Sequence, residues 1–115
     1  MSTKTKLLIV WSSEDREVAL KFPLLYGSVM LERNYWEEAH LMVWGPSIKL
    51  AATDKEIQEA IKKMRNSGVS MSACIICTDD YQATEALEKL GINNIHTGEM
   101  LTQCLKDDTW SVMTI

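Results

Sequence analysis

The chain has no long apolar run among its 115 residues. No segment approaches the roughly 20 consecutive apolar residues that a membrane-spanning helix needs. The apolar run at residues 7–11 is also too short for the core of a signal peptide. We therefore expect no membrane partner and a cytoplasmic location.

Positive charge is scarce as well, because 12 Lys and Arg residues face 16 Asp and Glu residues, a formal net charge of −4. A phosphate backbone repels a protein with that balance. We expect no nucleic-acid partner.

Cysteine is too rare for a disulfide framework, since three is a small and odd number. Free thiols are the expected state in a reducing compartment. Cys74 and Cys77 form a C-x-x-C motif, and Cys104 stands alone. A structural zinc site needs four ligands, usually from a second such pair, and only His40 and His96 could add to this one. We expect no metal.

The five glycines form neither a dinucleotide-binding fingerprint nor a phosphate-binding loop followed by Lys and Ser or Thr. No cofactor is therefore expected. The sequence also lacks repeats, low-complexity tracts and linkers, so residues 1–115 are expected to form one domain.

Short apolar runs alternate with helical patterns along the whole chain. Helices are expected between the strands, four in all, and such alternation predicts an α/β fold with a mainly parallel sheet and helices on both faces. The five expected strands cover residues 6–11, 38–44, 69–76, 92–96 and 110–115.

The first helix is expected to be capped by Ser12 or Ser13 and to bend or break at Pro23. A capping box at residues 53–56 begins the next helix. After the third strand, Thr78 or Asp79 is the expected cap. The apolar face predicted for the first helix consists of Val18, Phe22, Leu25 and Val29.

In open parallel sheets, ligands bind beyond the carboxyl ends of the strands. Ligand-binding candidates therefore follow the first two strands, and the segment at residues 96–98 follows the fourth. These candidates are Ser12, Ser13, Gly45, Pro46 and Ser47.

Cys74 and Cys77 lie where the third strand leads into a helix. The amino end of a helix favours an anion, so a thiol there loses its proton more easily and becomes a nucleophile. The alternative is that Cys74 is a small core residue. A thioredoxin-type redox pair is a further possibility. We expect Cys77 to be the more accessible of the two, and Cys104 to be a core residue.

The chain resembles the DsrE/DsrF-like family of small sulfur-relay proteins. Together, the segments that carry the resemblance cover nearly the whole chain in order. They are VWGPS at 43–47, KLA at 49–51, GV at 68–69, ACIIC at 73–77, LEKLGI at 87–92 and GEMLT at 98–102.

The resemblance implies a three-layer α/β/α fold, a homo-oligomer (trimer or hexamer), and a persulfide on Cys74 that passes between sulfur donor and acceptor proteins. Cys77 would then resolve the persulfide by forming a disulfide. The sequence departs from the family at residues 81–83, where Tyr81-Gln82-Ala83 replaces an expected Tyr-Gly pair. The competing hypothesis is a non-catalytic oligomeric binding or assembly module with structural thiols. Tyr35 and Trp36, two aromatics in a polar connection, also favour an oligomer.

Overall fold

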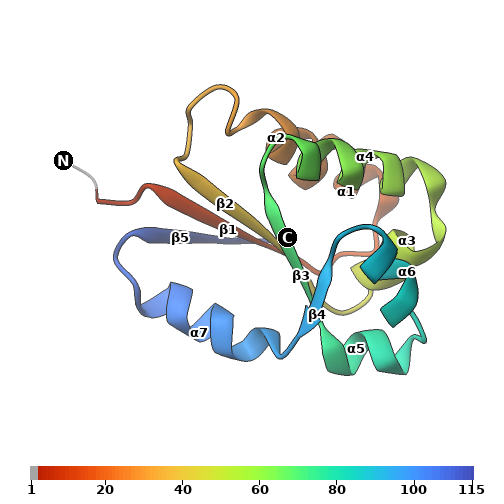
Figure 1. Cartoon of the computed structure of the whole chain (residues 1–115). Helices are drawn as coiled ribbons and strands as arrows, with labels where there is room; N and C mark the ends of the chain where they lie inside the picture. Colours follow the sequence, from red (N-terminus) through yellow and green to blue (C-terminus); the bar gives the residue numbers. More distant parts are fainter. Residues whose placement is uncertain (1–2) are drawn as a thin grey trace.

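The computed structural model describes residues 3–115, and its strands form one parallel sheet in the order β4-β3-β2-β1-β5 (Figure 1). Helices lie on both sides of this sheet, so the predicted fold class is confirmed. The strands are β1 (Lys6–Trp11), β2 (Glu38–Val43), β3 (Ser70–Cys74), β4 (Asn93–Ile95) and β5 (Trp110–Thr114).

The two faces of the sheet carry different amounts of helix. Alternate residues of β1 point to opposite faces, so Leu7 and Ile9 enter one core while Leu8 and Val10 enter another. The larger core receives side chains from the first six of the seven helices. The helices are α1 (Arg16–Lys21), α2 (Pro23–Val29), α3 (Ser47–Thr53), α4 (Lys55–Asn66), α5 (Ile75–Asp80), α6 (Thr84–Lys89) and α7 (Thr97–Lys106). The smaller core is closed by α7.

Residues 3–115 thus contain seven helices where the sequence predicted four. Pro23 breaks the first predicted helix into α1 and α2, as expected, because it begins α2 and cannot donate a hydrogen bond to the turn before it. Gln82, which has a positive φ of 54°, separates α5 from α6. The short helix α3 was not anticipated.

The apolar face predicted for the first helix was wrong. Val18, Phe22 and Leu25 are exposed, whereas Ala19 and Leu24 are buried. The prediction assumed one continuous helix, but the break at Phe22 (φ −125°, ψ −87°) changes the helical phase between α1 and α2. Three apolar side chains are consequently left on the surface.

Helix caps differ from the predicted ones by a few residues. Asp15, rather than Ser12 or Ser13, caps α1 by accepting from the N–H of Val18 at 3.0 Å. Asp54 caps α4 by accepting from the N–H of Ile57 at 3.1 Å. An aspartate oxygen is an effective acceptor at this position.

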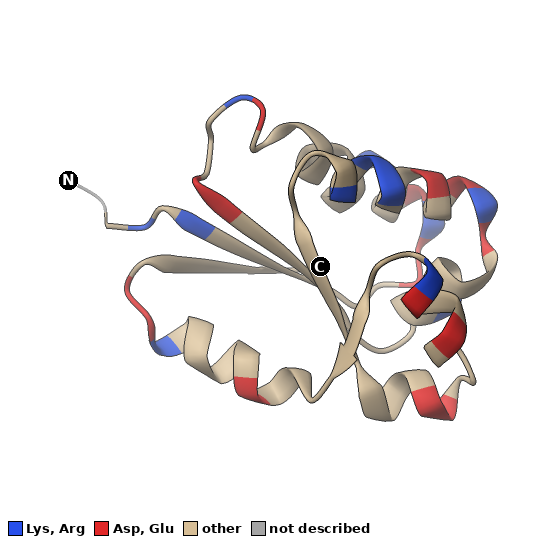
Figure 2. Cartoon of the chain, in the orientation of Figure 1, with Lys and Arg blue, Asp and Glu red and all other residues tan. Residues whose placement is uncertain are grey.

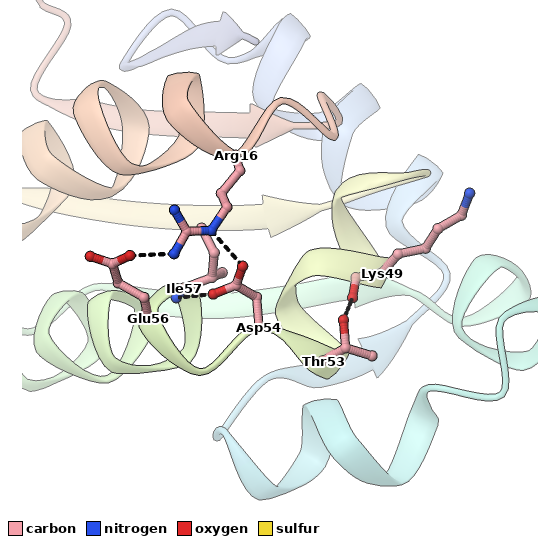
Figure 3. A network of polar contacts seen from close by, with 6 residues as sticks. All are labelled: Arg16, Lys49, Thr53, Asp54, Glu56 and Ile57. Carbon is pink, nitrogen blue, oxygen red and sulfur yellow. Dashed lines mark hydrogen bonds and ion pairs between the residues drawn. The ribbon is translucent and has the colours of Figure 1, made fainter.

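Arg16 joins the start of α1 to the start of α4 (Figure 3). Its Nε lies 2.7 Å from Asp54 Oδ2, and its Nη2 contacts Glu56. The Asp54 hydrogen bond is the largest reason why the pKa of Arg16 is raised, and the Arg16 hydrogen bond is the largest reason why that of Asp54 is lowered. Through its contacts with Asp54 and Glu56, Arg16 links the first turns of the two helices.

The third strand is shorter than predicted, because it ends at Cys74 and Ile75 already begins α5. Cys74 itself is the N-cap residue, so neither Thr78 nor Asp79 caps this helix. The buried Thr78 hydroxyl instead donates to the Ile75 carbonyl at 3.0 Å. A continuous apolar run does not mark where a buried strand becomes a helix.

Within the described residues, no helix has both the length and the apolar character that crossing a bilayer requires. In α4 the acidic residues Glu56 and Glu59 precede the basic residues Lys62, Lys63 and Arg65 (Figure 2). This order places opposite charges at the two ends of the helix dipole.

Candidate functional site

Cys74 lies where three elements meet. It ends β3, caps α5 and pairs in register with Ile95 of β4, which precedes α7 by two positions. Its side chain is 8% exposed, while Cys77 in the first turn of α5 is half-buried. The greater accessibility predicted for Cys77 is confirmed.

The surroundings of Cys74 stabilise its thiolate. Burial alone would raise its pKa, but hydrogen bonds from the backbone N–H and the side chain of Cys77 outweigh that effect. The Thr97 hydroxyl and the Ile76 N–H act in the same direction. The pKa of Cys74 therefore lies below the ordinary thiol value, as the position at a helix start predicts.

The other two thiols shift in the opposite direction. Burial is the largest cause that raises the pKa of Cys77, and its side-chain hydrogen bond with Cys74 raises it further. A hydrogen bond from the Gly45 N–H lowers it in part. Burial also raises the pKa of Cys104, with Asp107 adding to it. Cys104 is buried in the smaller core, which confirms its prediction as a core residue. Of the three thiols, Cys74 is the one poised to ionise.

Thr97 is a site residue that the sequence did not single out. Its side chain is 1% exposed. Its hydroxyl makes no hydrogen bond of regular geometry within residues 3–115, but it lies near enough to Cys74 to help lower the pKa of that thiol. The available signal was its place after the fourth predicted strand, at the edge where ligands were expected. The pairing of β3 with β4 is what brings it to Cys74.

Ser12 and Ser13 follow β1 and lie against the last residue of the sequence. Their backbone N–H groups donate to the Ile115 carbonyl at 2.7 and 3.1 Å, and the Ser12 hydroxyl donates to it at 3.2 Å. Ser13 Oγ accepts from the N–H of Asp15. The donors of Ser12 and the N–H of Ser13 are thus used by the Ile115 carbonyl, and a ligand-binding role for these two residues stays a prediction.

Gly45, Pro46 and Ser47 form the loop between β2 and α3. Gly45 has a positive φ of 75° and directs its N–H at Cys77. Pro46 is the N-cap residue of α3. The buried Ser47 hydroxyl donates to the Trp11 carbonyl at 2.6 Å. The loop is thus tied to both β1 and the thiol pair, and a ligand role for it stays a prediction.

Lys49 extends this edge of the molecule toward the turn after α5. Its Nζ lies 5.2 Å from the centroid of the Tyr81 ring and 3.8 Å from a Glu14 carboxylate oxygen. The sequence offered no signal for this contact, which joins residues distant along the chain.

The two histidines lie in different environments. His40 is buried on β2, where its ring nitrogens lie 2.7 Å from the hydroxyls of Ser70 and Ser72. Burial lowers the pKa of His40 to about 4. His96 is exposed at the start of α7 and makes no capping hydrogen bond with its side chain. No cluster of three or more potential metal ligands occurs in residues 3–115.

A hollow of about 480 Å³ lies on the side where β1 and β2 begin, away from the thiols. Tyr35 stacks on Tyr26 here at 6.2 Å, and Trp36 donates to the Tyr26 hydroxyl at 2.9 Å. Tyr35 and Trp36, which the sequence suggested for contacts between subunits, therefore each contact Tyr26 of their own chain. The hollow is lined by Lys4, Thr5, Leu31, Asn34, Tyr35, Trp36 and Glu37.

The chain matches no known family model, and no curated protein matches it either. It is similar to a solved structure, the conserved protein of unknown function BT1422 from Bacteroides thetaiotaomicron, with 29% identity and a TM-score of 0.93. That alignment covers 100% of this chain and 98% of the other.

Two further solved structures share the fold at lower identity. YchN from E. coli is 14% identical with a TM-score of 0.72, covering 97% of this chain and 99% of its own. MTH1491, a protein of unknown function from Methanobacterium thermoautotrophicum, is 14% identical with a TM-score of 0.71, covering 97% and 100%. At this identity the likeness concerns the fold alone. The comparisons therefore show that this chain shares its fold with these solved structures.

Proposed function

We propose that this chain is a sulfur-relay protein in which Cys74 accepts sulfane sulfur as a persulfide. The observation that carries the proposal is the position of Cys74. It is the thiol whose pKa is lowered, and it lies at the carboxyl end of a parallel strand, where folds of this class bind ligands. The DsrE-like fold of the structural neighbours is consistent with this role.

The transfer is a thiolate exchange that needs no oxidant or reductant. The Cys74 thiolate attacks the outer sulfur of a donor persulfide, and the S–S bond of the donor breaks. The donor leaves as a thiolate while the new S–S bond forms on Cys74. The same exchange with an acceptor thiol then releases Cys74. Donor and acceptor proteins are therefore the partners, and the chemistry is sulfurtransferase-like.

Cys77 provides a second outcome for the bound sulfur. Attack of the Cys77 thiolate on Cys74 Sγ forms a disulfide and expels the outer sulfur as hydrosulfide. Two thiols are oxidised in this step, and the sulfane sulfur is reduced to sulfide. The raised pKa of Cys77 keeps it protonated and so slows this reaction.

We also propose that the chain forms a homo-oligomer, a trimer or a hexamer. Support comes from the exposed apolar side chains of α1 and α2, where Phe22 is 46% and Leu25 is 53% exposed. Apolar surface of this kind often belongs to a protein interface. The same surface favours the second candidate function, an oligomeric binding or assembly module in which the thiols are structural. Free thiols suit a reducing compartment such as the cytoplasm.

Sulfur loading of single-cysteine variants separates the two functions. The protein is exposed to polysulfide and its mass is measured by mass spectrometry, alongside Cys74→Ser, Cys77→Ser and Cys104→Ser. The relay proposal expects the parent and Cys104→Ser to gain sulfur and Cys74→Ser to gain none. Loading of Cys74→Ser at the parent level, or a parent that takes up no sulfur, would favour the binding module.

Light scattering at micromolar concentration tests the oligomer. The parent should give the mass of a trimer or a hexamer. Leu25→Glu places a charge on the exposed apolar surface and should lower that mass, while Glu32→Gln on the following turn is a control without an apolar change. A monomeric parent contradicts the oligomer proposal.

A further inference from the structure

The amino-terminal turn of α7 faces the thiol site without a side-chain cap. His96 is its N-cap residue, has extended backbone, and makes no side-chain hydrogen bond to the first turn. The helix is 10 residues long, so its amino end carries the partial positive charge that attracts anions. A Cβ added at Gly98, the next residue after Thr97, would meet no atom within 4 Å, so the first turn is not crowded at that position.

The Thr97 hydroxyl points to an occupant for this space. It is 1% exposed and makes no hydrogen bond of regular geometry within the described chain. A buried hydroxyl without a partner destabilises a fold unless another group uses it. Cys74 pairs in register with Ile95, two residues before Thr97, and the Thr97 hydroxyl lies near enough to act on the Cys74 thiol.

We propose that the Thr97 hydroxyl and the first turn of α7 together form an anion site for the outer sulfur of the Cys74 persulfide. This inference rests on the proposed relay function and adds a positioning residue to it. The outer sulfur of a persulfide lies about 2 Å beyond Sγ. A persulfide loses its proton more readily than a thiol, so this outer sulfur arrives as an anion and accepts hydrogen bonds.

The two helices at Cys74 would then stabilise different sulfur atoms of the persulfide. The N–H groups of Ile76 and Cys77 in α5 already lie against the inner sulfur, Cys74 Sγ. Thr97 and the end of α7 approach from the β4 side. The Thr97 hydroxyl acts on Cys74 Sγ while no sulfur is bound, and would donate to the outer sulfur once the persulfide has formed. Stabilising the outer sulfur as an anion favours the loaded state over return of the sulfur to the donor.

Thr97→Val removes the hydroxyl and keeps the branched shape of the side chain. The protein is loaded with sodium polysulfide, and the fraction carrying a persulfide on Cys74 is followed over time by mass spectrometry of the Cys74 peptide. We expect Thr97→Val to retain about tenfold less persulfide than the parent, as loss of a charge-assisted hydrogen bond implies. Thr97→Ser, which keeps the hydroxyl, should restore it.

Thr102→Val is the matched control on the same helix. The Thr102 hydroxyl donates to the Gly98 carbonyl on the exposed side of α7, so its loss should leave persulfide retention at the parent level. The pKa of the Cys74 thiol, measured from the pH dependence of alkylation, should rise in Thr97→Val and stay unchanged in Thr102→Val. A purely structural role for Thr97 would move neither readout.

The outcomes distinguish this inference from the function beneath it. If the parent loads sulfur and Thr97→Val retains it equally well, the anion site is wrong while the relay function stands. If the parent takes up no sulfur, both fail. If Thr97→Val loses its persulfide and Thr97→Ser does not recover it, the hydroxyl is not the cause and the inference is overturned.

Discussion

Two polar clusters share one face of β2 and β3, and they differ in how completely their hydrogen bonds are made. In the amino half of the sheet, His40 lies between Ser70 and Ser72, and both ring nitrogens have a hydroxyl 2.7 Å away. At the carboxyl end, Cys74 lies beside the Thr97 hydroxyl, which makes no hydrogen bond of regular geometry in residues 3–115.

The difference separates a structural network from a candidate site. A buried network with every polar atom paired rigidifies the fold and needs nothing from outside. An unpaired buried donor costs stability unless a ligand or an anion uses it. The His40 cluster therefore maintains the sheet, and the Cys74 cluster is where the chemistry is to be sought.

Acid should disturb the His40 cluster first. Its pKa is lowered from 6.5 to about 4 by burial, so between those pH values the unfolded chain binds a proton that the folded chain does not. Stability therefore falls as pH drops from about 6.5 to about 4, by about 3 kcal/mol in all. Urea unfolding at several pH values measures this loss.

His40→Gln is the control, because it removes the titrating group and should flatten the slope in that window. The carboxyl of Asp54, whose pKa is also lowered, loses its stabilising effect only at still lower pH. Equal slopes for parent and variant would show that His40 does not govern acid stability.

Removing one hydroxyl from each cluster should have opposite consequences. Ser72→Ala leaves a buried ring nitrogen of His40 without its partner and should cost about 1–3 kcal/mol. Thr97→Val removes a hydroxyl that makes no hydrogen bond of regular geometry within the described chain and should leave stability unchanged or slightly higher. Denaturant unfolding compares the two, and a large loss in Thr97→Val would mean that its hydroxyl is already satisfied.

The fold was predictable because apolar runs and capping residues are local features that can be recognised in the sequence alone. The runs at residues 6–11 and 38–44 became β1 and β2, and Gly91 ends the segment before β4 with a φ of 81°. Failures occurred where one residue changes the phase of a pattern. The break at Phe22 turned a predicted buried face outward, and the helical turn after Cys74 shortened a predicted strand.

The candidate site was predictable only in part. Cys74 was found because C-x-x-C at a strand-to-helix junction is a local signal. Thr97 was not, since its relation to Cys74 arises from pairing between β3 and β4. The same holds for His40 and Ser70, which are neighbours only through the register of β2 and β3. Local sequence cannot report contacts that strand pairing creates.

The three thiols should differ in reactivity at neutral pH. Cys74 has a lowered pKa, whereas Cys77 and Cys104 have raised ones, so Cys74 should be alkylated about tenfold faster or more. Cys74 is more deeply buried than Cys77, which would slow its alkylation. The measured order therefore shows whether ionisation or solvent access controls the rate. Mass spectrometry of iodoacetamide-treated protein, quenched over time, measures the rates. Faster labelling of the half-buried Cys77 would mean that access governs the site.

Two turns of the molecule differ in how well their residue tolerates a positive φ, and this difference should have the smallest effect on stability. Gln82, in the turn after α5, has φ 54°, and Asn34, in the connection before β2, has φ 59°. Asparagine adopts this left-handed conformation more readily than glutamine does. Gln82→Gly should therefore stabilise the fold by about 0.5–1 kcal/mol, the left-handed penalty less the entropy that glycine loses. Asn34→Gly, the matched change in the other turn, should alter stability by only a few tenths of a kcal/mol. Urea unfolding of both variants measures the difference. A destabilised Gln82→Gly would show that the glutamine side chain holds this turn through contacts worth more than its strain.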